Sequence, residues 1–316
     1  MKNYVVGVDI GGQTTKIGIV DRSGAIVAQT VITSKYNADE GEKFMDSVCE
    51  AICDLAKGVG FDQIHGVGIG APNGNYYTGC IAFAPNLPWA KNQSVPLKAY
   101  MEDKLGIPVT LTNDANAAAV GEMTYGAARG MKNFIMITLG TGVGSGIIVN
   151  GELVYVHDGF AVELGHTIAV RHNGRQGGCG RNGGLESYAS AIGVARTARE
   201  WLGSGKYEDS LLSDIEEITS KDVYEAAVKG DKLAIDVFNF TGTLLGRQFA
   251  DFVAFSAPEA IVVFGGLARA GEFIFKPIKE SMEANLLTIW KDKVAVIPSA
   301  LKESDAAILG ASALAW

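Results

Sequence analysis

The chain has 316 residues, 47% hydrophobic and 20% charged, which is typical of one large globular domain or two ordinary ones. Its net charge of −8 argues against a partner bound through nucleic-acid phosphates. No run of about 18 apolar residues predicts a membrane span. The four cysteines form no C-x-x-C pair and no regular framework. Together these features predict a cytoplasmic enzyme with reduced thiols and no membrane or nucleic-acid partner.

The first predicted elements form a three-stranded antiparallel meander at 4–9, 16–20 and 25–33. The stretch "DIGGQTTK" makes the first connection, and "DRSG" is a turn signal for the second. A helix at about 40–57 follows, since Phe44, Val48 and Ile52 recur at helical spacing. Next, "HGVGIGAP" is typical of a buried strand, and "IPVTLTNDANAAAVGEM" predicts a strand, a polar turn and an alanine-rich helix.

The opening pattern returns 129 residues later, in "FIMITLGTGVGSGIIVNGELV". Val8 then corresponds to Ile137 and Gly11 to Gly140, and strand, glycine turn, strand and reverse turn recur in the same order. A repeat this long does not fit a solenoid and predicts two similar domains. The remaining sequence predicts helices at 184–201, 220–229 and 231–256, a strand in "PEAIVVFGG" and a last helix in "ESDAAILGASALAW".

Both glycine turns are candidates for phosphate binding. Oriented backbone N–H groups bind phosphate oxygens, and glycine lets the anion approach closely. Asp9 ends the first strand beside such an anion, where an acid makes sense if Mg²⁺ bridges the two. The alternative is an ordinary hairpin, which the second turn disfavours. The chain has no G-x-x-x-x-G-K-[ST] loop, and a strand rather than a helix follows "GTGVGSG", so the dinucleotide-binding interpretation fails.

Polar side chains elsewhere are candidates for acid–base chemistry and sugar binding. Asp114 stands where a strand meets a helix; Asn113 or Asp114 could cap that helix, or Asp114 could accept a proton from a substrate hydroxyl. Glu163, His166 and Glu186 lie in a glycine-dense region. They could hydrogen-bond to sugar hydroxyls or serve only as caps and turn residues.

Seven motifs occur in order along almost the whole chain: "DIGGQTTK", "APNLPW", "NDANAAAVGE", "LGTGVGSGIIVNG", "ELGH", "CGRNGGLE" and "VVFGGLARAG". In this combination the sequence resembles the ROK family of sugar kinases and repressors, within the actin-like ATPase superfamily. The resemblance implies an α/β, two-domain actin-like ATPase (ribonuclease H-like) fold with an interdomain cleft. We expect a small domain at 1–117, a large domain at 118–301, and a C-terminal helix at 302–316 that packs back on the small domain.

The resemblance also implies ATP and Mg²⁺ as cofactors and a role for each motif. Asp114 matches the catalytic base that deprotonates the sugar 6-hydroxyl, and Asp9 would bind Mg²⁺ through water. The expected ATP and phosphate residues are Gly11, Gly12, Gln13, Thr14, Lys16, Gly140, Thr141, Gly142, Gly144, Gly265 and Gly266. The expected hexose residues are Gly70, Ala71, Asn86, Asn113, Asp114, Glu163, His166 and Glu186, with Gly70 opening the sugar loop "GAPNGN".

Two departures from the family pattern change the expectations. Gln13 replaces the threonine of D-I-G-G-T, which predicts altered phosphate geometry rather than loss of ATP binding. Many members have three cysteines that join the "ELGH" histidine around a structural zinc. Here the matching positions are Gly177, Cys179 and Gly184. Only His166 and Cys179 remain of four ligands, so we expect no zinc.

The sequence therefore predicts an ATP-dependent glucokinase or hexokinase that acts on glucose and forms a homodimer. N-acetylglucosamine, mannose, fructose and allose stay open as alternative substrates. A non-catalytic sugar-binding regulator is the rival from another class, and the intact phosphate motifs argue against it. The first hairpin begins at residue 4, which leaves no room for the DNA-binding module of the family's repressors.

Overall fold

The computed structural model describes residues 2–160 and 162–316, which divide into two compact units. The first unit consists of Met1–Met131, Gly146–Val162 and Ser299–Trp316. The second consists of Lys132–Ser145 and Glu163–Pro298. These units differ from the ranges expected from the sequence, because the first one is assembled from three separate stretches of chain.

The first unit is built on a five-stranded sheet in the order β3-β2-β1-β4-β7. The meander predicted from the sequence is confirmed, since β1 pairs antiparallel with β2 and β2 with β3. The last two strands are parallel to β1. The strands are β1 (Tyr4–Ile10), β2 (Thr14–Asp21), β3 (Ile26–Thr33), β4 (Ile64–Gly70) and β7 (Val109–Thr112), and a small separate pair is formed by β5 (Ile81–Ala82) and β6 (Ser94–Val95).

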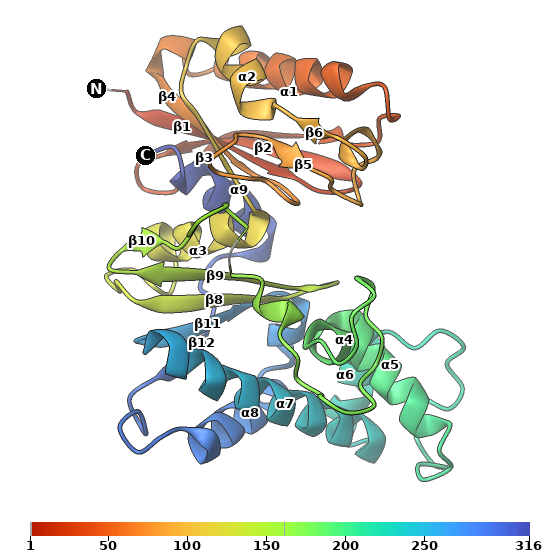
Figure 1. Ribbon diagram of the computed structural model, residues 1–316. Coiled ribbons are helices and arrows are strands. Elements are labelled where there is room, and N and C mark those ends of the chain that lie inside the picture. Colours follow the sequence, from red (N-terminus) through yellow and green to blue (C-terminus); the bar gives the residue numbers. More distant parts are fainter. Residues whose placement is uncertain (1, 161) are drawn as a thin grey trace. The chain divides into compact units, whose positions relative to one another are not determined.

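Helices cover both faces of this first sheet (Figure 1). On one face lie α1 (Gly41–Ala56) and α2 (Leu97–Leu105), whose apolar side chains enter the main core with Trp89 stacked on Phe44 at 4.3 Å. On the other lie α3 (Asp114–Tyr125) and the C-terminal α9 (Glu303–Ala313). Two short 3₁₀ turns, η1 (Phe61–Gln63) and η2 (Pro88–Ala90), complete the unit.

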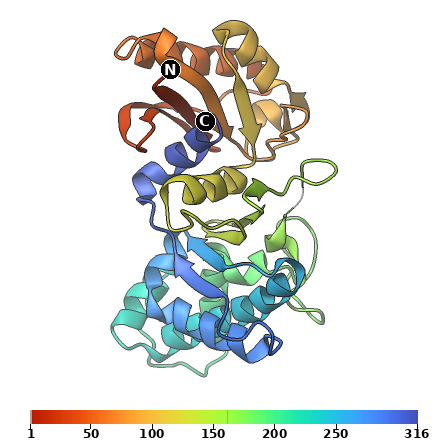
Figure 2. The same cartoon turned by 90° about the vertical axis from the view of Figure 1, so that its left-hand side faces the viewer.

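A row of glycines lets α9 lie unusually close to the first sheet. Gly18, Gly7 and Gly68 are register partners on β2, β1 and β4. A Cβ added at Gly7 would lie 2.2 Å from the Ile308 carbonyl oxygen, and one at Gly68 would lie 1.9 Å from that of Ala311. These glycines therefore serve packing rather than ligand binding, which the sequence alone did not distinguish. Figure 2 shows the C-terminal helix, in dark blue, against the red strands of this unit.

The second five-stranded sheet has the order β10-β9-β8-β11-β12. It begins with the predicted repeat of strand, glycine turn, strand, reverse turn and strand, which is confirmed. Parallel strands β11 and β12 extend it on the other side of β8. The strands are β8 (Phe134–Leu139), β9 (Val143–Val149), β10 (Glu152–Leu153), β11 (Ala260–Phe264) and β12 (Ala295–Pro298).

Most helices of the second unit follow β10 in the sequence, and α7 and α8 lie side by side along their length (Figure 1). The close approach is possible because Gly242 on α7 faces Pro277 on α8. The elements are η3 (Leu164–His166), α4 (Glu186–Ala189), α5 (Ala191–Leu202), α6 (Ser220–Val228), α7 (Lys232–Ser256), η4 (Gly266–Ala270) and α8 (Glu272–Asn285).

One helix prediction is wrong in its extent. The single helix expected at 184–201 is two helices, because Ser190 takes an extended conformation between α4 and α5. Its hydroxyl accepts a hydrogen bond from the Gly193 N–H at 3.1 Å and so caps the second helix. Within residues 2–160 and 162–316, no helix combines the length and apolar character needed to cross a bilayer.

Candidate active site

Parallel strands bring three predicted site segments to one edge of the first sheet. Asp9 is the register partner of Gly70, and Gly70 is the partner of Thr112, so β1, β4 and β7 end at the same level. The carboxyl ends of parallel strands form the usual binding edge of an open α/β sheet. Asn113 and Asp114 follow directly after β7, and a Cβ added at Gly70 would lie 3.4 Å from the Asp114 Cα.

The structure separates the roles of the two residues that could cap α3. Asn113 is the N-cap residue, and its Oδ1 accepts a hydrogen bond from the Ala115 N–H at 2.8 Å. Asp114 is the first helical residue; its Oδ1 accepts from the same N–H at 2.9 Å. Its side chain keeps a solvent-accessible face, although protein atoms crowd the carboxylate. This desolvation raises the pKa of Asp114 above its usual range, and the backbone N–H groups partly offset it.

Asp9 shares this electrostatic environment. Burial, followed by the negative charge of Asp114, raises the pKa of Asp9 to about 6, while Lys16 acts in the opposite direction. Lys16 lies opposite Asp9 in the β1–β2 register. A buried carboxylate beside a second negative charge fits a neighbouring cation, and Mg²⁺ takes few protein carboxylates besides water and phosphate oxygens. The residues present therefore fit an Mg²⁺ held through Asp9.

The first glycine turn presents unused backbone donors. Gly11 N–H is already bonded to the Thr14 carbonyl at 3.0 Å. The N–H groups of Gly12 and Gln13 donate to no protein acceptor in the described parts of the chain. The Gln13 carbonyl accepts from Ser34 N–H at 3.0 Å, which fixes the turn and leaves its side chain exposed. These two amides are suitably exposed for an anion.

Hexose candidates of the first unit surround this turn and the end of β7. A Cβ at Gly12 would lie 3.3 Å from that of Asn86, so the exposed Asn86 lies against the turn. Ala71 N–H donates to the Thr112 carbonyl at 3.0 Å, which holds the sugar loop beside Asn113. The first unit therefore brings together its predicted metal, phosphate, base and hexose residues.

The second glycine turn resembles the first, although its closing hydrogen bond spans two residues rather than three. Gly140 N–H donates to the Gly142 carbonyl at 3.0 Å, while the Thr141 and Gly142 N–H groups have no acceptor among the residues that the structure describes. Gly144 N–H donates to the Thr138 hydroxyl at 3.1 Å. The Glu186 carboxylate accepts from Val143 N–H at 3.0 Å, so this predicted hexose residue also supports the turn.

Three polar side chains adjoin one another at η3. His166 Nε2 lies 3.9 Å from Glu163 Oε2, and its Nδ1 lies 3.9 Å from Cys179 Sγ. Residues 177 and 184 are glycines, and the described residues contain no cluster of three or more His, Cys, Asp or Glu side chains arranged for a metal. Two donors do not satisfy a structural zinc, which takes four. The residues present therefore do not fit that metal.

The two glycines of the predicted adenosine motif differ in the space that surrounds them. Gly265 follows β11 with a φ of +107°, and a Cβ there would lie 2.5 Å from the Leu139 carbonyl oxygen. A Cβ at Gly266 would meet no protein atom within 4 Å. Gly265 is therefore required by the fold, and Gly266 leaves open surface that a ligand can approach.

Sequence reasoning did not find the residues that hold the site residues in place. Ser34 and Thr138 bond to the first and second turns. Asn75 anchors the sugar loop, since its Oδ1 accepts from Tyr77 and Thr78 N–H and its Nδ2 donates to the Asp158 carbonyl. Arg175 carries a buried network described below. Only Arg175 had a sequence signal, since it stands at the start of a glycine-rich run, which also contains Arg181.

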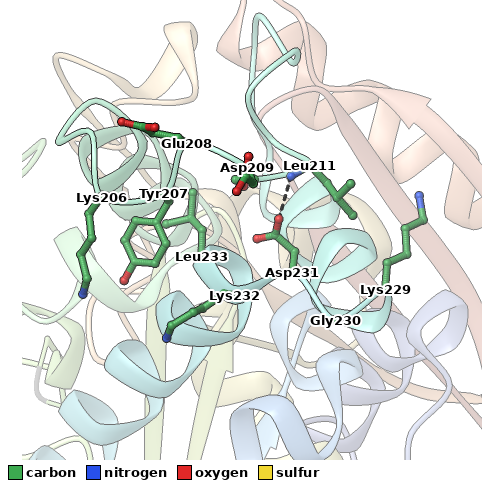
Figure 3. Close-up of a pocket in the computed structure, with 11 residues that line it drawn as sticks. Lys206, Tyr207, Glu208, Asp209, Leu211, Lys229, Gly230, Asp231, Lys232 and Leu233 are labelled. Carbon is green, nitrogen blue, oxygen red and sulfur yellow. Dashed lines mark hydrogen bonds between the residues drawn. The ribbon is translucent and has the colours of Figure 1, made fainter.

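A separate hollow of about 390 Å³ lies in the second unit (Figure 3). No predicted site residue lines it; its walls come from 206–211 and 229–233. Several of its polar groups bond to one another or to nearby residues. Asp231 caps α7 and accepts from Leu211 N–H at 2.7 Å, and Asp236 binds both Lys232 and the Tyr207 hydroxyl at 2.8 Å. We assign no function to this hollow.

The family model described as "ROK family" matches residues 5–316. The chain belongs to the ROK family. A protein named glucokinase from Halalkalibacterium halodurans is 38% identical over 90% of this chain and 86% of its own. Another, from Thermotoga maritima, is 34% identical over 99% and 97%. A ROK glucokinase structure from Streptomyces griseus, in complex with glucose and AMPPNP, aligns with a TM-score of 0.78 and 34% identity over 98% of both chains. The expected actin-like ATPase fold of this ROK protein is thereby confirmed.

Proposed function

We propose that this ROK protein is an ATP-dependent kinase that phosphorylates the 6-hydroxyl of glucose. The observation that carries the proposal is the similarity to proteins named glucokinase over nearly the full chain, at 34–38% identity. The solved glucokinase bound to glucose and an ATP analogue supports the same pair of substrates. The geometry supports the proposal with a candidate base, two sets of open amides and a candidate carboxylate for Mg²⁺.

Asp114 is the proposed general base. A carboxylate with a raised pKa is better matched to a sugar hydroxyl than an ordinary aspartate, and its place on the first turn of α3 fixes its position. Asn113 caps the helix, so the Asp114 carboxylate is not needed as the cap and can act on the substrate in this proposal. In-line phosphoryl transfer has a loose transition state, so catalysis depends mainly on positioning and charge stabilisation.

The open amides of both glycine turns are the proposed phosphate donors. Gly12 and Gln13 belong to the first unit, and Thr141 and Gly142 belong to the second. Mg²⁺, when bound, neutralises charge on the phosphates, and Asp9 is its proposed protein contact. Gly266 offers open surface for the adenosine, next to a Gly265 that the fold itself requires.

The proposed hexose contacts are polar side chains of the sequence motifs: Asn86, Asn113, Glu163, His166 and Glu186. Carboxylate and imidazole groups suit adjacent sugar hydroxyls. They do not by themselves distinguish glucose from its epimers, so mannose and the other hexoses stay as alternatives. A homodimer in the cytoplasm, where ATP and reduced thiols occur, is part of the same proposal.

Substitution of the base tests the mechanism. Asp114→Asn keeps the size and the backbone hydrogen bonds but removes the proton acceptor, so we expect kcat to fall by about 10²–10⁴-fold with a melting temperature that is not lowered. Asp103→Asn, on the exposed side of α2, is the matched control and retains full activity. Near-wild-type turnover of Asp114→Asn would remove Asp114 from the mechanism.

A coupled assay of ADP release tests the activity itself. We expect release that depends on hexose, with the highest kcat/KM for glucose among glucose, mannose, fructose, allose and N-acetylglucosamine. A higher kcat/KM for another sugar would reassign the substrate but keep the kinase. No release with any of these sugars, together with measurable sugar binding by calorimetry, would support the regulator instead.

A further inference from the structure

The segment from 167 to 185 connects two of the proposed hexose residues but has no helix or strand of its own. His166 precedes it, Glu186 follows it, and Cys179 within it contacts His166. It contains six glycines, which makes its ordering costly in conformational entropy. The metal that could hold such a segment does not fit the ligands present. Something else must therefore fix its conformation.

Arg175 is the one side chain in the described part of this segment with an extensive buried network. Its side chain is only 9% exposed. The guanidinium Nη1 donates to the Ser187 carbonyl at 3.2 Å, to the Thr197 hydroxyl at 2.9 Å and to the Gly193 carbonyl at 3.4 Å. Nε and Nη2 form a forked pair with Glu200 Oε2 at 3.1 and 2.5 Å. The guanidinium also lies over the Tyr188 ring at 4.5 Å.

The charges of this network are matched. Burial alone would raise the pKa of Glu200, but hydrogen bonds from Arg196 and Arg175 lower it below its usual range. Glu200 therefore stays ionised opposite the buried guanidinium. Arg196 contributes from the solvent side, where it donates to Glu200 and to the Gln176 carbonyl. A buried arginine with a forked carboxylate and carbonyl acceptors is a strong and directional cross-link.

Backbone hydrogen bonds connect Arg175 to the chain next to the proposed hexose residues His166 and Glu186. The Arg175 carbonyl accepts from Gly183 N–H at 2.8 Å, and the Gly183 carbonyl accepts from Ala169 N–H at 2.9 Å. Leu185 N–H donates to the Thr167 carbonyl at 2.9 Å, directly beside both His166 and Glu186. On the other side, the Ser187 carbonyl that Arg175 binds belongs to the residue after Glu186.

We propose that Arg175 is a positioning residue that fixes the 167–185 segment in place of a metal ion and thereby sets the hexose-binding geometry of His166 and Glu186. The inference rests on the proposed function for the identity of the ligand. The order of the segment is a separate claim, which can be measured without any sugar.

Kinetics of Arg175→Gln and Arg175→Lys test the positioning role. We expect the KM for glucose to rise by about 10-fold or more in Arg175→Gln, since several buried charged hydrogen bonds are lost. The first phosphate turn is not connected to this network, and the second contacts the segment's end through Glu186, so we expect kcat and the KM for ATP to change less than the KM for glucose. Arg175→Lys keeps the charge without the fork and restores part of the affinity. Arg171→Ala, an exposed arginine of the same segment, is the control and keeps the wild-type KM.

Hydrogen exchange of the ligand-free protein, followed by mass spectrometry, tests the order of the segment. We expect faster exchange in 167–185 for Arg175→Gln, with unchanged exchange in β1, β4 and α8, which also shows that the variant is folded. Unchanged exchange in the segment would overturn the inference, as would faster exchange with an unchanged KM for glucose. A wild-type protein without glucose turnover would instead overturn the proposed function.

Metal analysis of the purified wild-type protein tests whether a zinc ion, rather than Arg175, orders the segment. We expect no stoichiometric zinc, and equal glucose affinity before and after treatment with a zinc chelator in excess Mg²⁺. One zinc per chain that Cys179→Ser removes would overturn the claim that Arg175 acts in place of a metal.

Discussion

At the scale of single residues, the backbone geometry at the start of α3 separates two neighbouring polar side chains. Asn113 is the cap, and Asp114 is the first helical residue. Burial and then the charge of Asp114 raise the pKa of Asp9. Asp114 is 105 positions later in the sequence, and the strand order β1-β4-β7 brings it close to Asp9. Arg175 was not identified because its acceptors, two backbone carbonyls and the side chains of Thr197 and Glu200, lie 12 to 25 positions away in the sequence.

The raised pKa of Asp9 predicts a stability cost above pH 6. Between about pH 4 and pH 6 the folded state keeps this proton and the unfolded state has lost it, so stability falls as pH rises through that window. The loss is at most about 3 kcal/mol, from about 1.4 kcal/mol for each unit of pKa. We therefore expect Asp9→Asn to be more stable than wild type at pH 7.5, with the gain shrinking towards pH 4, when both are unfolded by urea.

Asp21 provides a control of opposite sign. A hydrogen bond from the Ser23 hydroxyl and others from nearby N–H groups lower the pKa of Asp21, so its contribution to stability is present at neutral pH and fades in acid. Asp21→Asn should lose stability at pH 7.5. An Asp9→Asn variant that is equally or less stable than wild type at pH 7.5 would contradict the assignment for Asp9.

At the scale of elements, periodicity and turn residues predicted most of the strands and the longer helices. The meander and its repeat have clear alternation and glycine turns. The elements not predicted have weak local signals: α2 is short, β12 has four residues and ends at Pro298, and α8 contains Pro277. Pro277 is accommodated because it packs against Gly242 of α7, a contact that local sequence does not reveal.

The contact between α9 and the first sheet predicts a severe effect of one methyl group. In Gly68→Ala the new Cβ would lie 1.9 Å from the Ala311 carbonyl oxygen, so the helix has to move away from β4. We expect a loss of at least about 1–3 kcal/mol, typical of overpacking, measured by urea unfolding. Gly58→Ala, where the nearest atom is at 3.7 Å, is the control and should be neutral. A neutral Gly68→Ala would show that the helix does not need this close approach.

At the scale of the whole molecule, the first unit joins residues that are almost 300 positions apart. Val5 and Val20 form a small core with Ile308 and Leu309 of α9. The Trp316 indole donates to the Tyr125 hydroxyl at 2.6 Å, which adds a contact between the C-terminus and α3. The packing of the last helix on the first domain was predicted from family resemblance alone. The composition of the helix does not indicate which element it packs against.

This connectivity predicts that damage to α9 weakens strands at the other end of the chain. Ile308→Asp places a charge in the core beside Val5 and Val20, so we expect faster hydrogen exchange in β1, β2 and β4. Exchange in α7 and α8, which belong to the second unit, should change little. Ser304→Ala, at an exposed position of the same helix, is the control. Equal acceleration in both units would mean that they unfold as one.

Because α9 follows the opening strands by almost 300 residues, those strands are synthesised long before the helix that covers them. During translation their glycine-lined face is exposed to solvent. Aliphatic side chains such as Val5 and Val20 are also exposed, because α9, which buries them, has not yet been synthesised. Nascent chains with such exposed apolar surface are prone to aggregate, which favours binding by a chaperone until α9 has been synthesised.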